Sequence, residues 1–178
     1  MTSSPATNPN IVLTGFMGTG KSTVGRLLAN RLGMRFVDTD RLIEETHGPI
    51  AEIFLHEGEV SFRRYETETA LSLAEQHGLV IATGGRFMLN EANAAPLLAS
   101  GHVYCLRADE DELIRRLTKS RTVRPLLQVD DPVARIRELL AERAKGYDQF
   151  EQVPTDSRPP DRVVNDIIGR YRTATGIE

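Results

Sequence analysis

The feature that most constrains this chain is a glycine-rich segment directly after a short apolar run. Ile11–Leu13 is followed by the sequence GFMGTGKS over residues 15–22. Glycines permit positive φ and close backbone approach, so that consecutive N–H groups can face an anion. Val24, Leu28 and Leu32 then follow at helical spacing. This strand–loop–helix pattern predicts a phosphate-binding loop that holds a nucleoside triphosphate.

Each polar residue of the loop has an expected task. Lys21 would place a positive charge on the β- and γ-phosphates, and Ser22 would offer its hydroxyl to Mg²⁺. The helix that begins near Lys21 adds the positive end of its dipole. The residues of this segment expected to bind ATP are Gly18, Thr19, Gly20, Lys21, Ser22 and Thr23.

Length and charge favour one domain and a small ligand. The chain has 178 residues and a net charge of −3, which suits a single domain and argues against nucleic acid as a partner. Met1–Asn10 is small and polar, so we expect a disordered tail over residues 1–9 and one domain over 10–178. Cys105 is the single cysteine and there is no run of 18 apolar residues. We therefore expect a cytoplasmic monomer with a buried thiol and no membrane contact.

The order of elements predicts a parallel sheet covered on both faces. Strands are expected at Ile11–Thr14, Arg35–Asp38, Leu79–Thr83, His102–Leu106 and Gln152–Thr155. Helices are expected at Lys21–Leu32, Asp40–Thr46, Ile50–Glu57, Glu59–Gln76, Glu91–Ser100, Asp109–Lys119, Pro132–Asp148 and Pro160–Arg172. The predicted class is a three-layer α/β/α P-loop NTPase fold with a five-stranded parallel sheet.

The segment over residues 119–131 is too irregular for a helix or strand and longer than a usual connection. It predicts a mobile lid. Closure would bring Arg121 and Arg124 onto the transferring phosphoryl group and would expel water. Solvated loop arginines are the alternative.

Two carboxylates follow the second predicted strand, at the edge where open α/β sheets bind ligands. Asp38 could hold Mg²⁺ through its water shell. Asp40 could accept the proton of an alcohol that attacks the γ-phosphate, or orient its hydroxyl. The alternative for Asp40 is a purely structural helix N-cap.

Two arginines are candidates for binding a carboxylate. Arg63 and Glu66 stand three residues apart on one helix, so the acid would hold the guanidinium ready for a bidentate contact. Arg143 lies within or beside the apolar face of its helix, where a charge usually has a partner. A surface ion pair for Arg63 and a side chain of Arg143 that snorkels to the rim are the alternatives.

The third predicted strand ends in the sequence TGGR over residues 83–86. Gly84 and Gly85 would let backbone N–H groups approach a ligand, and a plain tight turn is the alternative.

Taken together, these residues resemble those of the shikimate kinase family, and the resemblance extends from Ile11 over nearly the whole chain. The ordered motifs that carry it are Gly20–Thr23, Asp38–Asp40, Phe62–Glu66, Gly84–Gly85, Arg124–Leu127 and Arg143. The resemblance implies a nucleoside-monophosphate-kinase-like fold and phosphate transfer from MgATP to the 3-hydroxyl of shikimate, in the biosynthesis of chorismate and the aromatic amino acids.

The resemblance also implies residue roles. Asp40 would contact the reacting hydroxyl as the base, while Arg63, Gly85 and Arg143 would hold the rest of shikimate, the two arginines on its carboxylate. Phe54 and Phe62 would wall the pocket. Arg124 would be the lid arginine near the phosphates, and the segment over residues 155–159, with Arg158, resembles the one that packs against adenine.

The chain departs from the family pattern at Arg86, where similar sequences usually have a third glycine. Its charge would either add an anion contact or crowd the acceptor. The segment before Ile50 is one residue shorter than usual, and the lid arginines upstream of Arg124 do not align cleanly. A gluconate-type kinase of the same fold and a non-catalytic nucleotide switch are the competing functions.

Overall fold

The computed structural model describes residues 8–120 and 125–177. Its five strands are β1 (Asn10–Gly15), β2 (Arg35–Asp38), β3 (Leu79–Ala82), β4 (Gly101–Arg107) and β5 (Glu151–Pro154). All neighbouring strands pair in parallel, in the order β2-β3-β1-β4-β5. The predicted five-stranded parallel sheet is confirmed.

Eight α-helices connect and cover the strands within the described residues. They are α1 (Lys21–Leu32), α2 (Thr39–His47), α3 (Ile50–His56), α4 (Gly58–Ala74), α5 (Glu91–Ser100), α6 (Glu110–Lys119), α7 (Pro132–Tyr147) and α8 (Pro160–Thr175). Two short 3₁₀ helices are η1 (Phe87–Leu89) and η2 (Pro125–Leu127). Each predicted helix is present, with bounds that differ by no more than a few residues.

The central position of β1 explains its composition. It pairs with β3 on one side and with β4 on the other, with Val12 opposite both Ile81 and Val103. Every residue of β1 is buried. A strand that is covered on both faces and paired at both edges is largely apolar, which accounts for the uninterrupted run Ile11–Leu13. The buried polar residues of β1, Asn10 and Thr14, flank this run.

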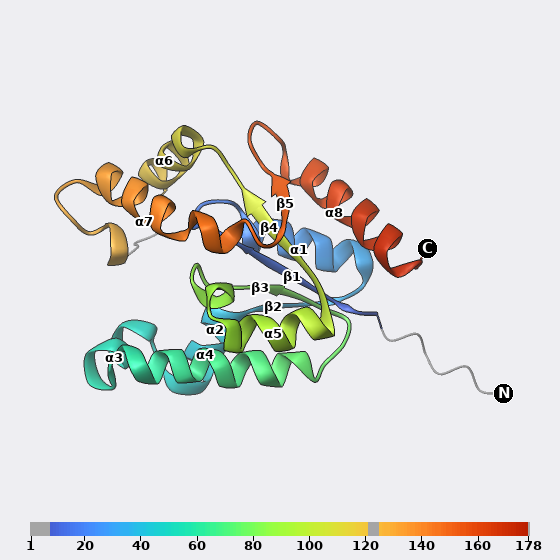
Figure 1. Cartoon of the computed structure of the whole chain (residues 1–178), viewed down its shortest axis with the longest axis horizontal. Coiled ribbons are helices and arrows are strands. Elements are labelled where there is room, and N and C mark those ends of the chain that lie inside the picture. Colours follow the sequence, from blue (N-terminus) through green and yellow to red (C-terminus); the bar gives the residue numbers. More distant parts are fainter. Residues whose placement is uncertain (1–7, 121–124, 178) are drawn as a thin grey trace.

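Helices cover both faces of the sheet, with α1 and α8 on one side and α4 and α5 on the other (Figure 1). The first face packs Ile11, Leu13, Leu28, Val164 and Ile167 into one core cluster. The second face packs Val12, Leu73, Ile81, Phe87 and Leu97 into another. The sheet is thus the middle of three layers, as the sequence predicts.

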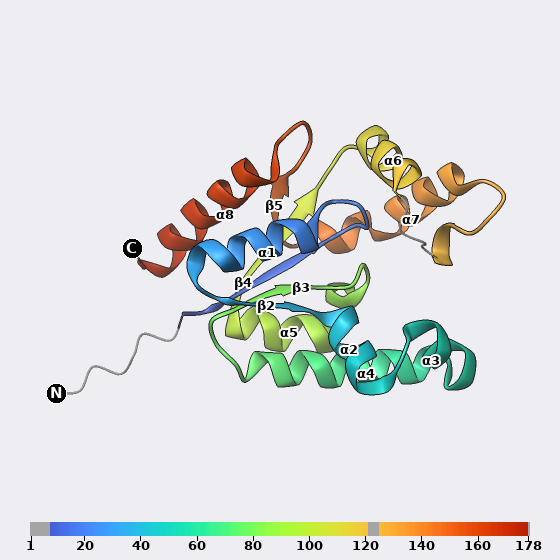
Figure 2. The ribbon, with the colours of Figure 1, turned by 180° about the vertical axis from the view of Figure 1, so that it is seen from behind.

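The remaining helices lie around the carboxyl ends of the strands. Helix α3 packs against α4, while α6 and α7 lie together beyond the ends of β4 and β5 (Figures 1 and 2). The loops after β1, β2 and β3 therefore open toward a region bordered by α4 and α7. Ligands of open α/β sheets bind at this edge.

The described chain begins earlier than the expected tail allows. The carbonyl of Asn8 accepts a hydrogen bond from the Gly78 N–H at 2.8 Å, and that of Pro9 accepts one from the Tyr171 hydroxyl at 2.8 Å. Residues 8 and 9 are therefore attached to the domain. Residues 1–7 of the expected tail lie outside the described residues.

Candidate active site

The loop after β1 has a backbone that only glycine accommodates readily. Gly15, Gly18 and Gly20 have φ of 129°, 81° and 96°. A Cβ on Gly15 would lie 2.3 Å from the carbonyl oxygen of Leu106. The glycines thus permit both the left-handed turn and the close approach of β4.

Polar contacts inside this loop hold it in shape. Lys21 Nζ donates to the carbonyls of Gly15 and Phe16 at 2.8 and 2.9 Å, and Thr19 Oγ1 donates to the Phe16 carbonyl at 2.8 Å. Helix α1 follows from Gly20 without a side-chain cap. Its first N–H groups are therefore available to an anion at the helix N-terminus.

The loop after β2 joins the phosphate loop through a hydroxyl–carboxylate contact. Ser22 Oγ donates to Asp38 Oδ2 at 3.0 Å. Asp38 also accepts from the Arg41 N–H at 3.4 Å and is the N-cap of α2. The structural cap left open for Asp40 therefore belongs to Asp38, and Asp40 is in the first turn of the helix.

The Ser22–Asp38 pair has the chemistry that Mg²⁺ prefers, since both donors are oxygens. No cluster of three or more His, Cys, Asp or Glu side chains that could hold a metal occurs among the described residues. Mg²⁺ in nucleotide sites usually keeps one or two protein ligands together with waters and phosphate oxygens. The residues present fit this arrangement.

Asp40 has an unusually basic carboxylate. Burial, followed by the charges of Asp38 and Glu66, raises its pKa from 3.8 to about 6, while Lys21 acts in the opposite direction. A carboxylate with a pKa near neutrality is well suited to proton transfer. The surroundings of Asp40 thus fit it for the role of base that the sequence suggests.

The two glycines after β3 make room for side chains from other elements. A Cβ on Gly84 would lie 2.5 Å from Asp40 Oδ1, and one on Gly85 would lie 3.2 Å from Arg143 Nη1. The Gly84 N–H donates to Thr39 Oγ1 at 3.1 Å. The Asp40 carboxylate from α2 and the Arg143 guanidinium from α7 therefore lie against neighbouring residues of the same turn.

The predicted pair on α4 is formed and is largely buried. Arg63 Nη1 donates to Glu66 Oε2 at 2.8 Å, and the residue Glu66 is 2% exposed. Burial raises the pKa of Glu66, whereas its bond with Arg63 lowers it. The Arg63–Glu66 ion pair is therefore not the surface pair considered as the alternative. Arg63 also bonds Glu59, which is exposed.

Arg143 is buried rather than extended to the rim. The residue is 4% exposed, and its guanidinium carbon lies 5.7 Å from the centre of the Phe16 ring. Its Nε has no hydrogen-bond partner, and burial lowers its pKa. No carboxylate among the described residues forms an ion pair with it. Burying a guanidinium without a counter-charge costs free energy, and an anionic ligand that binds beside Arg143 would remove that cost.

Phe54 and Phe62, the expected walls of the substrate pocket, lie side by side, and their role in the pocket remains a prediction. Phe62 of α4 is buried and Phe54 of α3 is partly exposed, with ring centres 5.0 Å apart. The Arg63 guanidinium lies 5.2 Å from the centre of the Phe62 ring. The ring thus supports an arginine proposed to bind the acceptor.

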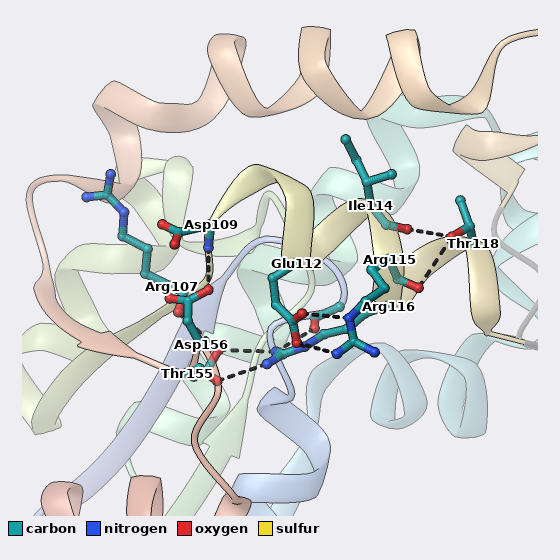
Figure 3. A network of polar contacts seen from close by, with 10 residues as sticks. Arg107, Asp109, Glu112, Ile114, Arg115, Arg116, Thr118, Thr155 and Asp156 are labelled. Carbon is teal, nitrogen blue, oxygen red and sulfur yellow. Dashed lines mark hydrogen bonds and ion pairs between the residues drawn. The ribbon is translucent and has the colours of Figure 1, made fainter.

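Sequence reasoning did not single out Arg116 of α6. Its Nη1 donates to the Gly18 carbonyl and to Thr155 Oγ1 at 3.3 and 3.2 Å, and its Nη2 donates to the Thr155 carbonyl at 2.8 Å. Glu112 pairs with its Nε at 2.7 Å (Figure 3). Arg116 stands three residues after Leu113 and so lies beside the apolar face of α6. The same argument that singled out Arg143, that a charge in such a position usually has a partner, would have predicted this.

Tyr147 of α7 was also not singled out. Its hydroxyl donates to the carbonyl of Gly85. This bond holds the turn after β3 against the helix that carries Arg143. Tyrosines in apolar helix faces usually find such a partner when they are buried.

Two expected nucleotide contacts remain predictions. Arg158 Nη1 donates to the Pro154 carbonyl and to Asp166 Oδ2, both at 3.1 Å, and so ties the segment after β5 to α8. Arg121 and Arg124, in the expected lid, lie outside the described residues.

Comparison with known proteins agrees with this geometry. The family model described as shikimate kinase matches residues 17–172. A shikimate kinase of Thermodesulfovibrio yellowstonii is 44% identical over 164 residues, which cover 91% of this chain and 94% of that protein. The chain belongs to the shikimate kinase family. It is therefore an ATP-dependent kinase, and the non-catalytic switch is set aside.

Solved structures give the same result. A shikimate kinase from Acinetobacter baumannii, solved in complex with shikimate, is 36% identical, covers 94% of both chains and has a TM-score of 0.85. A gluconokinase from Sinorhizobium meliloti has a TM-score of 0.67 at 19% identity over 97% of this chain and 96% of that one. The second likeness shows a shared fold only.

No helix among the described residues is long and apolar enough to cross a membrane. The monomeric state and the cytoplasmic location expected from the sequence remain predictions.

Proposed function

We propose that this chain transfers the γ-phosphoryl group of MgATP to the 3-hydroxyl of shikimate, at the site between the phosphate loop and α7. The observation that carries this assignment is the turn at Gly84 and Gly85, against which two groups are placed: an Asp40 carboxylate of raised pKa, and a buried Arg143 that forms no ion pair with a carboxylate of the described residues. A hydroxyl and a carboxylate on one small ring would engage both groups at once.

Asp40 is the proposed base. It accepts the proton of the acceptor hydroxyl or orients that hydroxyl for in-line attack on the γ-phosphorus. Lys21 stabilises charge on the transferring group, and the N-terminus of α1 adds to this. Positioning and electrostatics supply most of the acceleration in such reactions.

Arg143 and Arg63 are the proposed carboxylate ligands. Arginine binds a carboxylate through two parallel N–H donors, which fixes both the position and the orientation of the acceptor. Glu66 holds Arg63, and Phe54 and Phe62 line the apolar side. Gluconate also carries a carboxylate, but it is flexible and would match this fixed set less well.

Ser22 and Asp38 would hold Mg²⁺, directly or through water. When bound, the ion would supply positive charge that offsets the negative charge developing on the phosphates during transfer. The proposed nucleotide contacts of Arg158, and of Arg124 outside the described residues, complete the set predicted from the sequence.

The test is ADP release from MgATP with shikimate, with gluconate and without acceptor. We expect release that depends on shikimate and is lost in Lys21→Ala. Arg63→Ala and Arg143→Ala should raise the KM for shikimate and leave the KM for ATP near that of the wild type. Release with gluconate alone, or without any acceptor, would contradict the assignment.

A further inference from the structure

Arg86 is the residue of the turn after β3 that the proposed function leaves unused. Its φ and ψ are −112° and −5°, an ordinary conformation for any amino acid, so a side chain here causes no backbone strain. The side chain is 49% exposed, and its nearest carboxylate oxygen is Glu59 Oε1, 3.9 Å from Nη1. Arg86 thus lies beside the acidic partner of Arg63.

The N–H donors of the Arg63 guanidinium are already bonded to two acids of its own helix, α4. Its Nε and Nη2 donate to Glu59 Oε1 at 3.2 and 2.8 Å, and its Nη1 donates to Glu66 at 2.8 Å. Nε and the terminal nitrogen beside it form the edge of the guanidinium best suited to a bidentate carboxylate contact. Glu59 therefore occupies the edge that an acceptor carboxylate would use.

The two acids that hold Arg63 differ in their freedom to move. Glu66 is buried, and leaving it without its guanidinium would be costly. The Glu59 side chain is 57% exposed, so it can exchange one partner for another at low cost. Glu59 is the group that can leave when an acceptor arrives.

A displaced Glu59 needs a counter-charge, because its carboxylate would otherwise repel the carboxylate of the acceptor. Arg86, in the turn after β3, already faces Glu59 Oε1, the oxygen that bonds Arg63. Besides Glu59, the groups that Arg86 influences are Glu66, Arg143 and the neutral Tyr147 hydroxyl. Arg143 is a cation and Glu66 is already held by Arg63, so Glu59 is the acid that Arg86 is placed to receive.

We propose that Arg86 is a positioning residue that takes Glu59 away from Arg63 when a carboxylate-bearing acceptor binds, so that Arg63 can donate to that acceptor. This inference rests on the proposed function, since it concerns how the same site admits its acceptor. It assigns a task to Arg86, a position where the family resemblance leads us to expect a glycine.

The experiment is a double-mutant cycle of Arg86→Gln and Glu59→Gln. In the protein that retains Glu59, Arg86→Gln should raise the KM for shikimate about threefold to fivefold. This is the range expected for the loss of an exposed ion pair. The kcat and the KM for ATP should stay within a factor of two. In the Glu59→Gln background, the same change should have no effect, because no carboxylate remains to be displaced.

The control is Arg64→Gln, which removes a neighbouring exposed arginine that pairs with Glu68 at 3.7 Å. It should leave all three parameters unchanged. Rescue by Arg86→Lys, which keeps the charge, supports the proposal further.

Three results would overturn the inference. They are an unchanged KM in Arg86→Gln, an equal rise in both backgrounds, which would mean direct contact with the acceptor, and a fall in KM, which would mean that Arg86 obstructs the pocket. The proposed function fails separately, if the unaltered enzyme releases no ADP in response to shikimate. Calorimetric titration with shikimate then tests the cycle by affinity instead of KM, and absence of binding would overturn it.

Discussion

Replacing Asp40 with asparagine should make the protein more stable while removing most of its activity. The surroundings of Asp40 raise its pKa from 3.8 to about 6, chiefly by burial and then through Asp38 and Glu66. The folded state therefore tolerates the charged carboxylate less well than the unfolded chain does. A rise of this size corresponds to about 3 kcal/mol.

The sign of the effect follows from proton binding. Between about pH 4 and pH 6, the folded state binds the Asp40 proton more tightly than the unfolded state, so this residue's contribution to stability falls as the pH rises. Above about pH 6 the full penalty is present in the wild type. Asp40→Asn has no charge to bury and escapes it.

The assay is urea unfolding of both proteins at pH 8 and at pH 4. At pH 8, Asp40→Asn should unfold at a urea concentration about 1.5 M higher, given a slope of about 2 kcal/mol per molar. At pH 4 the difference should largely disappear. Turnover with shikimate should fall by about a hundredfold or more, the usual contribution of a general base.

The control is Glu45→Gln, which removes an exposed carboxylate from the same helix, paired with Arg41 at 2.8 Å. Its stability should differ from the wild type by less than about 0.5 kcal/mol. An Asp40→Asn protein that is no more stable than the wild type at pH 8 would refute the account of the raised pKa. Near-normal turnover would refute the role of the carboxylate in proton transfer.

Three further results are expected. Gly84→Ala would push the Asp40 carboxylate away, because its Cβ would lie 2.5 Å from Oδ1. The kcat should drop about tenfold or more while the unfolding midpoint changes little, and an unchanged kcat would contradict this. Arg116→Gln, which removes the bonds to Thr155, should raise the KM for ATP about tenfold and the KM for shikimate much less. An equal rise in both KM values would contradict this prediction. Cys105 is 2% exposed and burial raises the pKa of its thiol to about 11, so a disulfide reagent at pH 8 should label it only after unfolding; rapid labelling of the folded protein would disprove the point.

Local patterns predicted most of the fold. The bounds of α1 and α5 follow from apolar spacing and flanking residues alone, and all five strands were expected near their observed positions. Helix and strand formation depends mainly on periodicity, caps and turn residues, all of which are adjacent in sequence. The N-cap of α2 was considered only for Asp40, whereas the structure places it at Asp38, two residues earlier and of the same type.

The candidate site was predicted in part. Carboxylates and glycines after successive parallel strands had to share one edge of the sheet, so Asp40 and Gly84 could be grouped in advance. Arg63 was singled out by its spacing from Glu66 on one helix. Arg116 and Tyr147 escaped notice because their partners, Thr155 and Gly85, are 39 and 62 residues away. Pairing over such distances depends on packing, which no local pattern encodes.

By itself, the sequence determined the kind of chemistry, since the glycines, Lys21 and Ser22 that surround a phosphate all lie within one segment of eight residues. Tertiary structure alone decided the electrostatic state of the site. It buried Asp40 beside other acids, buried Arg143 with no ion-pair partner among the described residues, and placed Arg86 against the acid that bonds Arg63. A pKa or an ion pair depends on burial and on neighbours from distant segments, and these exist only once the chain has folded.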